Sequence, residues 1–139
     1  MANCYILSSS LLTLPEEKLD DARKILEKVT NHLEEDSEDG YVGYDASVID
    51  NPANIHEAVG VWIRHNESIN TSHVEILART LLEELDLPEP FIFSWAYTCD
   101  APRSDNFGGG ACCVQKGKPT LWVDAVRELN FLRERRDKE

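Results

Sequence analysis

An alternating run of aromatic side chains limits what this chain can fold into. Phe91, Phe93, Trp95 and Tyr97 occupy every second position of the segment 91–99. Successive side chains of a β-strand point to opposite faces of a sheet, so this pattern predicts a strand with one buried face. A buried face needs a covering layer of helices or of a second sheet. We therefore interpret the aromatic stripe as part of a core rather than as a platform for nucleic acid bases.

Two segments upstream have the periodicity of amphipathic helices. Each is expected to begin at a capping box, formed by Thr13 and Glu16 in the first segment and by Ser72 and Glu75 in the second. Apolar residues at three- and four-residue spacing predict one buried stripe on each helix. The first stripe contains Leu19, Ala22, Ile25, Leu26, Val29 and Leu33, and the second contains Val74, Leu77, Ala78, Leu81, Leu82 and Leu85.

The order of these segments predicts an α+β fold. Strands are expected at 3–12, 41–49, 58–65 and 91–99. Together with the helices they form a βαββαβ series, which predicts a ferredoxin-like antiparallel sheet with two helices on one face. A C-terminal hairpin over 111–123 and a short helix over 125–132 are expected to extend this sheet. The chain of 139 residues is expected to form a single domain (1–139) with frayed last residues.

The negative charge is concentrated in the first two thirds of the chain. The chain has a net charge of −12, and residues 1–90 carry nineteen acids and six bases, whereas residues 91–139 carry seven acids and eight bases. Such a field repels nucleic acid backbones and anionic membranes, and it attracts basic surfaces. We therefore expect a basic protein partner, such as a nucleic-acid-binding complex, and no direct binding to nucleic acid or membrane. Solubility alone is the alternative explanation.

The first helix is expected to end in an acidic turn, where negative charge opposes the helix dipole. An arrangement that is unfavourable for folding suggests that a basic partner supplies the counterions. The spacing of these acids does not match a helix-loop-helix calcium site. The candidate partner-binding surface consists of Glu34, Glu35, Asp36, Glu38, Asp39, Asp45 and Asp50.

The cysteine and histidine positions indicate no metal or cofactor. Cys112 and Cys113 are adjacent, so on a strand they point to opposite faces and cannot bind one ion together. The N-terminus has no secretory pattern, and no apolar run is long enough to span a membrane. We therefore expect a cytoplasmic protein in which all four cysteines are free thiols.

A polar loop after the aromatic strand is the second candidate site, for a small-ligand or anion-binding module or an enzyme. Cys99 is the candidate nucleophile and Arg103 the candidate anion ligand. The three glycines at 108–110 fit a bend between two strands better than a phosphate loop, because no helix follows them. The loop candidates are Cys99, Asp100, Arg103, Asp105, Asn106, Phe107, Gly108 and Gly109.

Part of this region resembles a group of uncharacterised small acidic proteins from bacteria, plasmids and phages. The resemblance rests on the TCxxPR pattern within 97–103 and on the FGGGA pattern within 106–111. It implies no catalytic or binding residue. It does imply an association with mobile elements, whose accessory proteins include inhibitors of host defence such as anti-CRISPR proteins.

Taken together, these features predict a non-enzymatic acidic protein that docks on a basic partner and acts as an inhibitor or as a nucleic acid mimic. A homodimer, formed through an exposed sheet edge or an aromatic face, is a further alternative.

Overall fold

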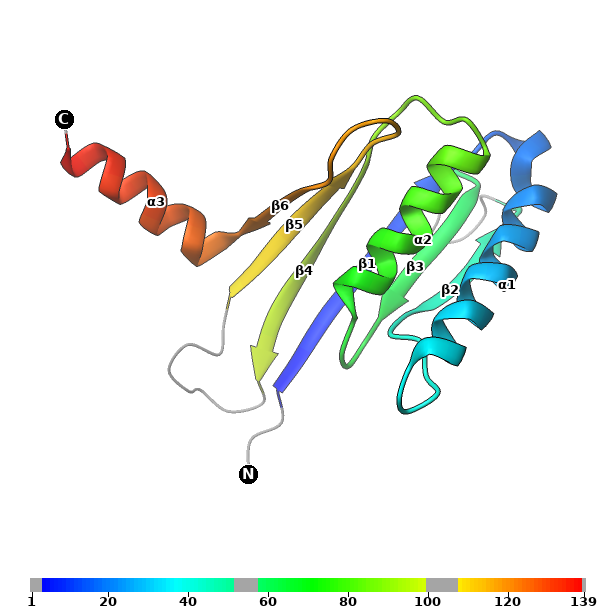
Figure 1. The fold of residues 1–139 in the computed structure, drawn as a ribbon, viewed down its shortest axis with the longest axis horizontal. Coiled ribbons are helices and arrows are strands. Elements are labelled where there is room, and N and C mark those ends of the chain that lie inside the picture. The colour runs from blue at the N-terminus through cyan, green and yellow to red at the C-terminus, as the bar shows by residue number, and fades with distance from the viewer. Residues whose placement is uncertain (1–3, 52–57, 100–107, 139) are drawn as a thin grey trace.

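The computed structural model describes residues 4–51, 58–99 and 108–138. These residues form one six-stranded antiparallel sheet and three α-helices (Figure 1). The strand order across the sheet is β2-β3-β1-β4-β5-β6. The elements are β1 (Cys4–Thr13), a 3₁₀ turn (Glu16–Lys18), α1 (Leu19–Asp36), β2 (Asp45–Ile49), β3 (Gly60–His65), α2 (Thr71–Glu84), β4 (Phe91–Cys99), β5 (Gly108–Val114), β6 (Leu121–Asp124) and α3 (Ala125–Asp137).

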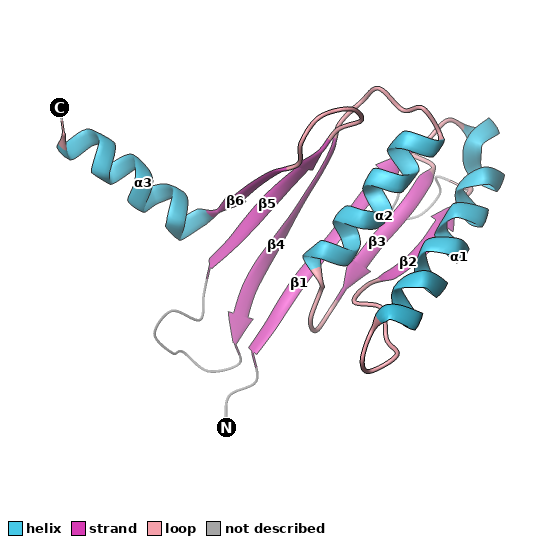
Figure 2. Ribbon diagram, viewed as in Figure 1, coloured by secondary structure: helices cyan, strands magenta, loops and turns pink. Residues whose placement is uncertain are grey.

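The helices α1 and α2 cover one face of the sheet, and α3 lies apart from them (Figure 2). The core between these layers combines the predicted helical stripes with alternate strand residues such as Val61, Ile63 and Phe93. Of the stripe residues, only Leu26 is not fully buried. The other face of the sheet has no covering helix among the described elements.

The predicted α+β class is confirmed, and the sheet continues beyond the four strands of the expected βαββαβ series. Strand β5 pairs with β4 over seven register positions, from Phe91–Val114 to Tyr97–Gly108, and β6 then pairs with β5. The predicted hairpin therefore exists, but its first strand begins at Gly108 rather than at residue 111. Together β5 and β6 make the sheet wider than the helical layer over it.

Neither predicted capping box forms. Thr13 is the last residue of β1, and α1 begins only after the 3₁₀ turn, at Leu19; its N-cap residue, Lys18, makes no side-chain cap. In α2 the cap is Asn70, whose Oδ1 accepts a hydrogen bond from the backbone N–H of His73 at 3.1 Å. Asparagine is as good an N-cap as serine, so the spacing at Ser72 pointed to the wrong residue.

The expectation that all four cysteines are free thiols is wrong. Cys4 and Cys99 form a disulfide, and their Cα atoms are 4.0 Å apart. The antiparallel register of β1 and β4 places the two residues directly opposite each other, although they are 95 positions apart in the sequence. Cys112 and Cys113 are free.

The three glycines belong to a strand and do not form the expected bend. Gly108, Gly109 and Gly110 pair with Tyr97, Ala96 and Trp95 across the ladder between β4 and β5. A Cβ atom at Gly110 would lie 2.5 Å from Cζ2 of the Trp95 indole. The missing side chain at Gly110 therefore makes room for the indole to lie across β5.

The C-terminal helix is longer and more exposed than expected. It continues to Asp137 through the segment for which a frayed tail was predicted, and none of its residues is buried. It projects away from the rest of the molecule at the β6 edge (Figure 1). Within the described ranges, no helix combines the length and the apolar character that crossing a membrane requires.

Candidate functional site

The acidic candidates fall into one cluster and two separate residues. Glu34, Glu35 and Asp36 form the last turn of α1, and Glu38 and Asp39 follow in the next turn; all five are exposed. We call these five residues the acidic turn. Because α1 carries no basic residue in its last turn, their charges add to the negative end of the helix dipole.

Two carboxylates of the acidic turn, Asp36 and Asp39, have partners within the chain. His32 Nε2 lies 3.2 Å from an oxygen of Asp36. The Ser37 hydroxyl and the Tyr41 backbone N–H donate to Asp39 at 2.6 and 3.1 Å, and these bonds, the Ser37 bond most, hold the pKa of the Asp39 carboxyl below its usual value. Asp39 therefore stays ionised in more acidic solution than an isolated aspartate.

The three glutamates of the acidic turn have no counterion within the described ranges. Glu34, Glu35 and Glu38 form no ion pair with any described residue. Their full charge therefore faces solvent at one end of α1.

The fold separates Asp45 and Asp50 from the acidic turn. Asp50 pairs with Arg23 at 3.0 Å, near the start of α1 rather than its end. Asp45 lies opposite Arg64 in the register of β2 and β3, on the face of the sheet that the helices leave uncovered. The predicted acidic surface is therefore smaller than the sequence suggested.

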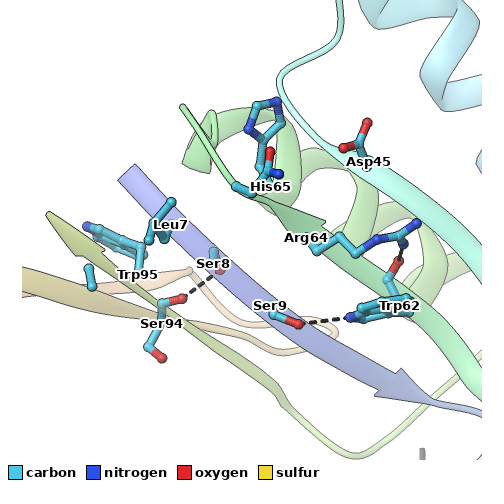
Figure 3. A pocket seen from close by; sticks show the side chains of 11 residues that line it. Leu7, Ser8, Ser9, Asp45, Trp62, Arg64, His65, Ser94 and Trp95 are labelled. Carbon is cyan, nitrogen blue, oxygen red and sulfur yellow. Dashed lines mark hydrogen bonds between the residues drawn. The ribbon is translucent and has the colours of Figure 1, made fainter. Parts of the chain in front are cut away.

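A shallow trough on the uncovered face of the sheet was not predicted from the sequence (Figure 3). Its volume is about 590 Å³, and β1, β3 and β4 contribute most of its lining. The Trp62 indole N–H donates to the Ser9 hydroxyl at 2.8 Å, and the Arg64 guanidinium lies 3.8 Å from the centre of the Trp62 ring. The guanidinium also donates to the Ser47 hydroxyl at 3.2 Å.

These contacts hold a cation and an aromatic ring together on the floor of the trough. No carboxylate among the described residues forms an ion pair with Arg64. A guanidinium in this position can bind an anionic group, but the Asp45 carboxylate lines the same trough and opposes such a ligand. In the sequence, Trp62 and Arg64 alternate with Val61 and Ile63, and this pattern indicates the two faces of β3. It does not indicate which strands lie beside β3, so the sequence does not predict the trough.

Most of the loop candidates lie outside the described residues. These are Asp100, Arg103, Asp105, Asn106 and Phe107. Within the described part, Cys99 is bonded to Cys4 and so has no free thiol to act as a nucleophile. Gly108 and Gly109 are paired strand residues.

Cys112, His65 and His73 have structural surroundings. Cys112 is 1% exposed, and burial, followed by the nearby Glu75 charge, raises the pKa of its thiol to about 12. His65 Nδ1 accepts from the Glu67 and Ser68 backbone N–H groups at 3.0 and 2.9 Å, and His73 Nδ1 accepts from Gly43 at 2.9 Å. Among the described side chains, no group of three His, Cys, Asp or Glu residues is arranged to hold a metal ion.

A search against protein-family models, a search of curated proteins and a search of solved structures each find no match to the chain.

Proposed function

We propose that this chain is a non-enzymatic binding protein whose acidic turn docks on a basic surface of a partner protein, such as a nucleic-acid-binding complex. The observation that carries the proposal is the set of three exposed glutamates, Glu34, Glu35 and Glu38, which have no counterion among the described residues. A basic partner would relieve both their mutual repulsion and their conflict with the helix dipole.

The resemblance of the segments 97–103 and 106–111 to plasmid and phage proteins supports a more specific form of the proposal. In that form the protein is an accessory protein of a mobile element that blocks host machinery, as anti-CRISPR proteins do, by offering carboxylates in place of phosphates. The proposal places the protein in the cytoplasm, where the Cys4–Cys99 pair would be kept reduced.

For the fold we propose that residues 4–99 are a ferredoxin-like unit to which β5, β6 and α3 have been added. The order β2-β3-β1-β4 with antiparallel neighbours supports this assignment. So does the position of α1 and α2 on a single face. A sheet of this kind presents α1 at its β2 edge, where the acidic turn is accessible from solution.

The proposal is tested by a pull-down from a bacterial host lysate with two triple variants of equal net charge. The first is Glu34→Gln/Glu35→Gln/Glu38→Gln, which neutralises the acidic turn. The second is Glu17→Gln/Glu67→Gln/Glu89→Gln, which neutralises three exposed acids elsewhere.

We expect the native chain and the second variant to capture the same basic protein, and the first variant to bind that protein at least roughly tenfold more weakly. Raising the salt from about 50 to 500 mM should weaken the native complex in the same way. Equal weakening by both variants would show a general charge effect and would contradict docking at the acidic turn.

A further inference from the structure

The C-terminal segment carries most of the exposed large apolar side chains of the described chain. Seven of the twelve such residues lie between positions 121 and 132, and they are 44% to 67% exposed. Their combined exposed area is on the order of 600 Å², which is at the upper end of the largest apolar patch expected on a soluble monomer. The seven are Leu121, Trp122, Val123, Val126, Leu129, Phe131 and Leu132.

Part of this surface forms a groove between α3 and the sheet. The groove has a volume of about 830 Å³, with Trp95 and Trp122 on its sheet side and Val126 and Phe131 on its helix side. The Trp122 ring centre lies 6.1 Å from that of Trp95 and 6.4 Å from that of Phe93, so the sheet side is a continuation of the aromatic core. Neither α1 nor α2 extends over β6 (Figure 1).

The connection of α3 to the sheet leaves this groove open. Asp124 is both the last residue of β6 and the N-cap of α3, where its Oδ1 accepts from the Arg127 N–H at 3.0 Å. With no loop between the two elements, α3 continues outward and cannot fold back over its own sheet. No other described element covers this surface, and another molecule can bury it.

We propose that the groove is filled by α3 of a second copy of this chain, so that two copies form a dimer by reciprocal packing of their C-terminal helices. A two-fold interface uses the same patch on both subunits, and this patch contains both a groove and a helix with four exposed apolar side chains, Val126, Leu129, Phe131 and Leu132, that can enter it. Strand β6, which is the last strand of the sheet and has an unpaired edge among the described elements, lies at the same place.

The charge distribution favours a second copy as the occupant. Residues 125–138 carry five bases and three acids, whereas residues 1–124 carry nine bases and twenty-two acids, a net charge of −13. The basic helix of one copy is therefore attracted to the acidic body of the other. Glu128 and Glu134 line the groove itself, where they can pair with Arg135 of the incoming helix.

The area is compatible with a specific dimer. Leu121 and Val123 point to the opposite face of β6 from Trp122, so one interface buries only part of the exposed apolar area, on the order of 400 Å² on each copy. With the polar rim added, this is at the low end of the range for specific protein interfaces. An anionic membrane would attract α3 as well, but it has no strand to pair with the open edge of β6 and no helix to fill the groove. A second copy carries both, so we argue for the dimer.

The experiment measures molar mass by light scattering on a size-exclusion column, with the full chain loaded at about 5 to 200 μM. The test variant is Leu129→Glu/Leu132→Glu, and the matched control is Tyr41→Glu/Ile76→Glu, which changes two apolar residues that are 76% and 41% exposed, in the turn after α1 and on α2. Circular dichroism melting checks that both variants keep the fold. Hydrogen exchange of residues 125–137 is followed at both ends of the concentration range.

We expect the native chain and the control to be dimers, and the dissociation constant of the Leu129/Leu132 variant to rise at least about 100-fold. Protection of the α3 amides should increase with concentration in the native chain only. A native chain that is monomeric at 200 μM, or a test variant that dimerises as the control does, would overturn the proposal. If the native chain is monomeric and sediments with phosphatidylserine vesicles, and the test variant does not sediment with them, then α3 binds a membrane instead.

This proposal does not depend on the proposed function, because α3 and the acidic turn use different residues. The Glu34/Glu35/Glu38 variant should keep the dimer mass while losing the basic partner. The Leu129/Leu132 variant tests the dimer alone, so failure of either proposal can be recognised separately.

Discussion

At the scale of single residues, a glycine decides how the aromatic stripe packs. Gly110 leaves space for the Trp95 indole, which in turn contacts Phe93 and Trp122 with ring centres 5.7 and 6.1 Å apart. The Trp95 Nε1 atom is buried without a hydrogen-bond acceptor among the described residues. An indole in such a position is held by its packing, so it is sensitive to the volume beside it.

We predict that Gly110→Ala lowers the free energy of unfolding by about 1 to 3 kcal/mol, because the added methyl group overlaps both the Trp95 indole and the Val123 backbone oxygen. Urea unfolding followed by tryptophan fluorescence measures the change. In a Trp95→Ala background the same substitution should cost less, since the ring is absent, but the overlap with the Val123 oxygen should leave part of the cost. A cost within about 0.5 kcal/mol of zero in the native background would show that both the indole and β6 move aside freely.

At the scale of elements, the sequence predicts those features that depend on local periodicity. The stripe of α2, from Val74 to Leu85, is buried throughout as expected, and β4 has the predicted bounds. The start of α1 was misplaced because Thr13 is held in β1 by pairing with Gly60, a residue 47 positions away. Local capping patterns cannot reveal such a competing long-range contact.

The candidate site was harder to predict for the same reason. The acidic turn was predicted because its five residues all lie within positions 34–39 of the sequence. Asp45 and Asp50 lie away from this turn, because β2 leads the chain away from the end of α1. The trough and the disulfide depend on which strands are neighbours, as in the pairing of Cys4 with Cys99. The exposure of α3 follows from its direct connection to β6 at Asp124, which a helical pattern alone does not indicate.

The disulfide between β1 and β4 gives a prediction at this scale. Reduction should lower the free energy of unfolding by about 2 to 4 kcal/mol, because the bond closes a long loop and restricts the unfolded chain. Urea unfolding with and without a phosphine reductant measures this difference. Cys4→Ser/Cys99→Ser should match the reduced native chain in both conditions, and Cys113→Ser should keep the full response to reductant. A native chain with equal stability in both conditions would contradict a stabilising role for the bond.

At the scale of the whole molecule, charge is divided between an acidic body and a basic C-terminal helix. The acidic body includes the turn after α1, where charge is least favourable for folding, and the basic helix is the part with the most exposed apolar surface. We infer that the two ends of the molecule serve different contacts. The body would meet a basic partner, and the helix would meet a second copy of the chain.

This division predicts a conflict between stability and binding at the acidic turn. Neutralising Glu34, Glu35 and Glu38 should raise the free energy of unfolding by about 0.5 to 1 kcal/mol at low salt, because each glutamate opposes the dipole of α1 and repels its neighbours. The gain should disappear in about 0.5 M salt, where these interactions are screened. Urea unfolding at the two salt concentrations measures it.

Asp21 provides the matched control, because it lies in the first turn of the same helix, where the dipole favours a negative charge. Asp21→Asn should therefore lose a few tenths of a kcal/mol where the glutamate variant gains. If the glutamate variant is more stable than the native chain and no longer binds the basic partner, then these charges serve binding and reduce the stability of the fold. If the glutamate variant is no more stable than the native chain at low salt, the charges are not unfavourable, and the main physical reason for assigning them a partner is removed.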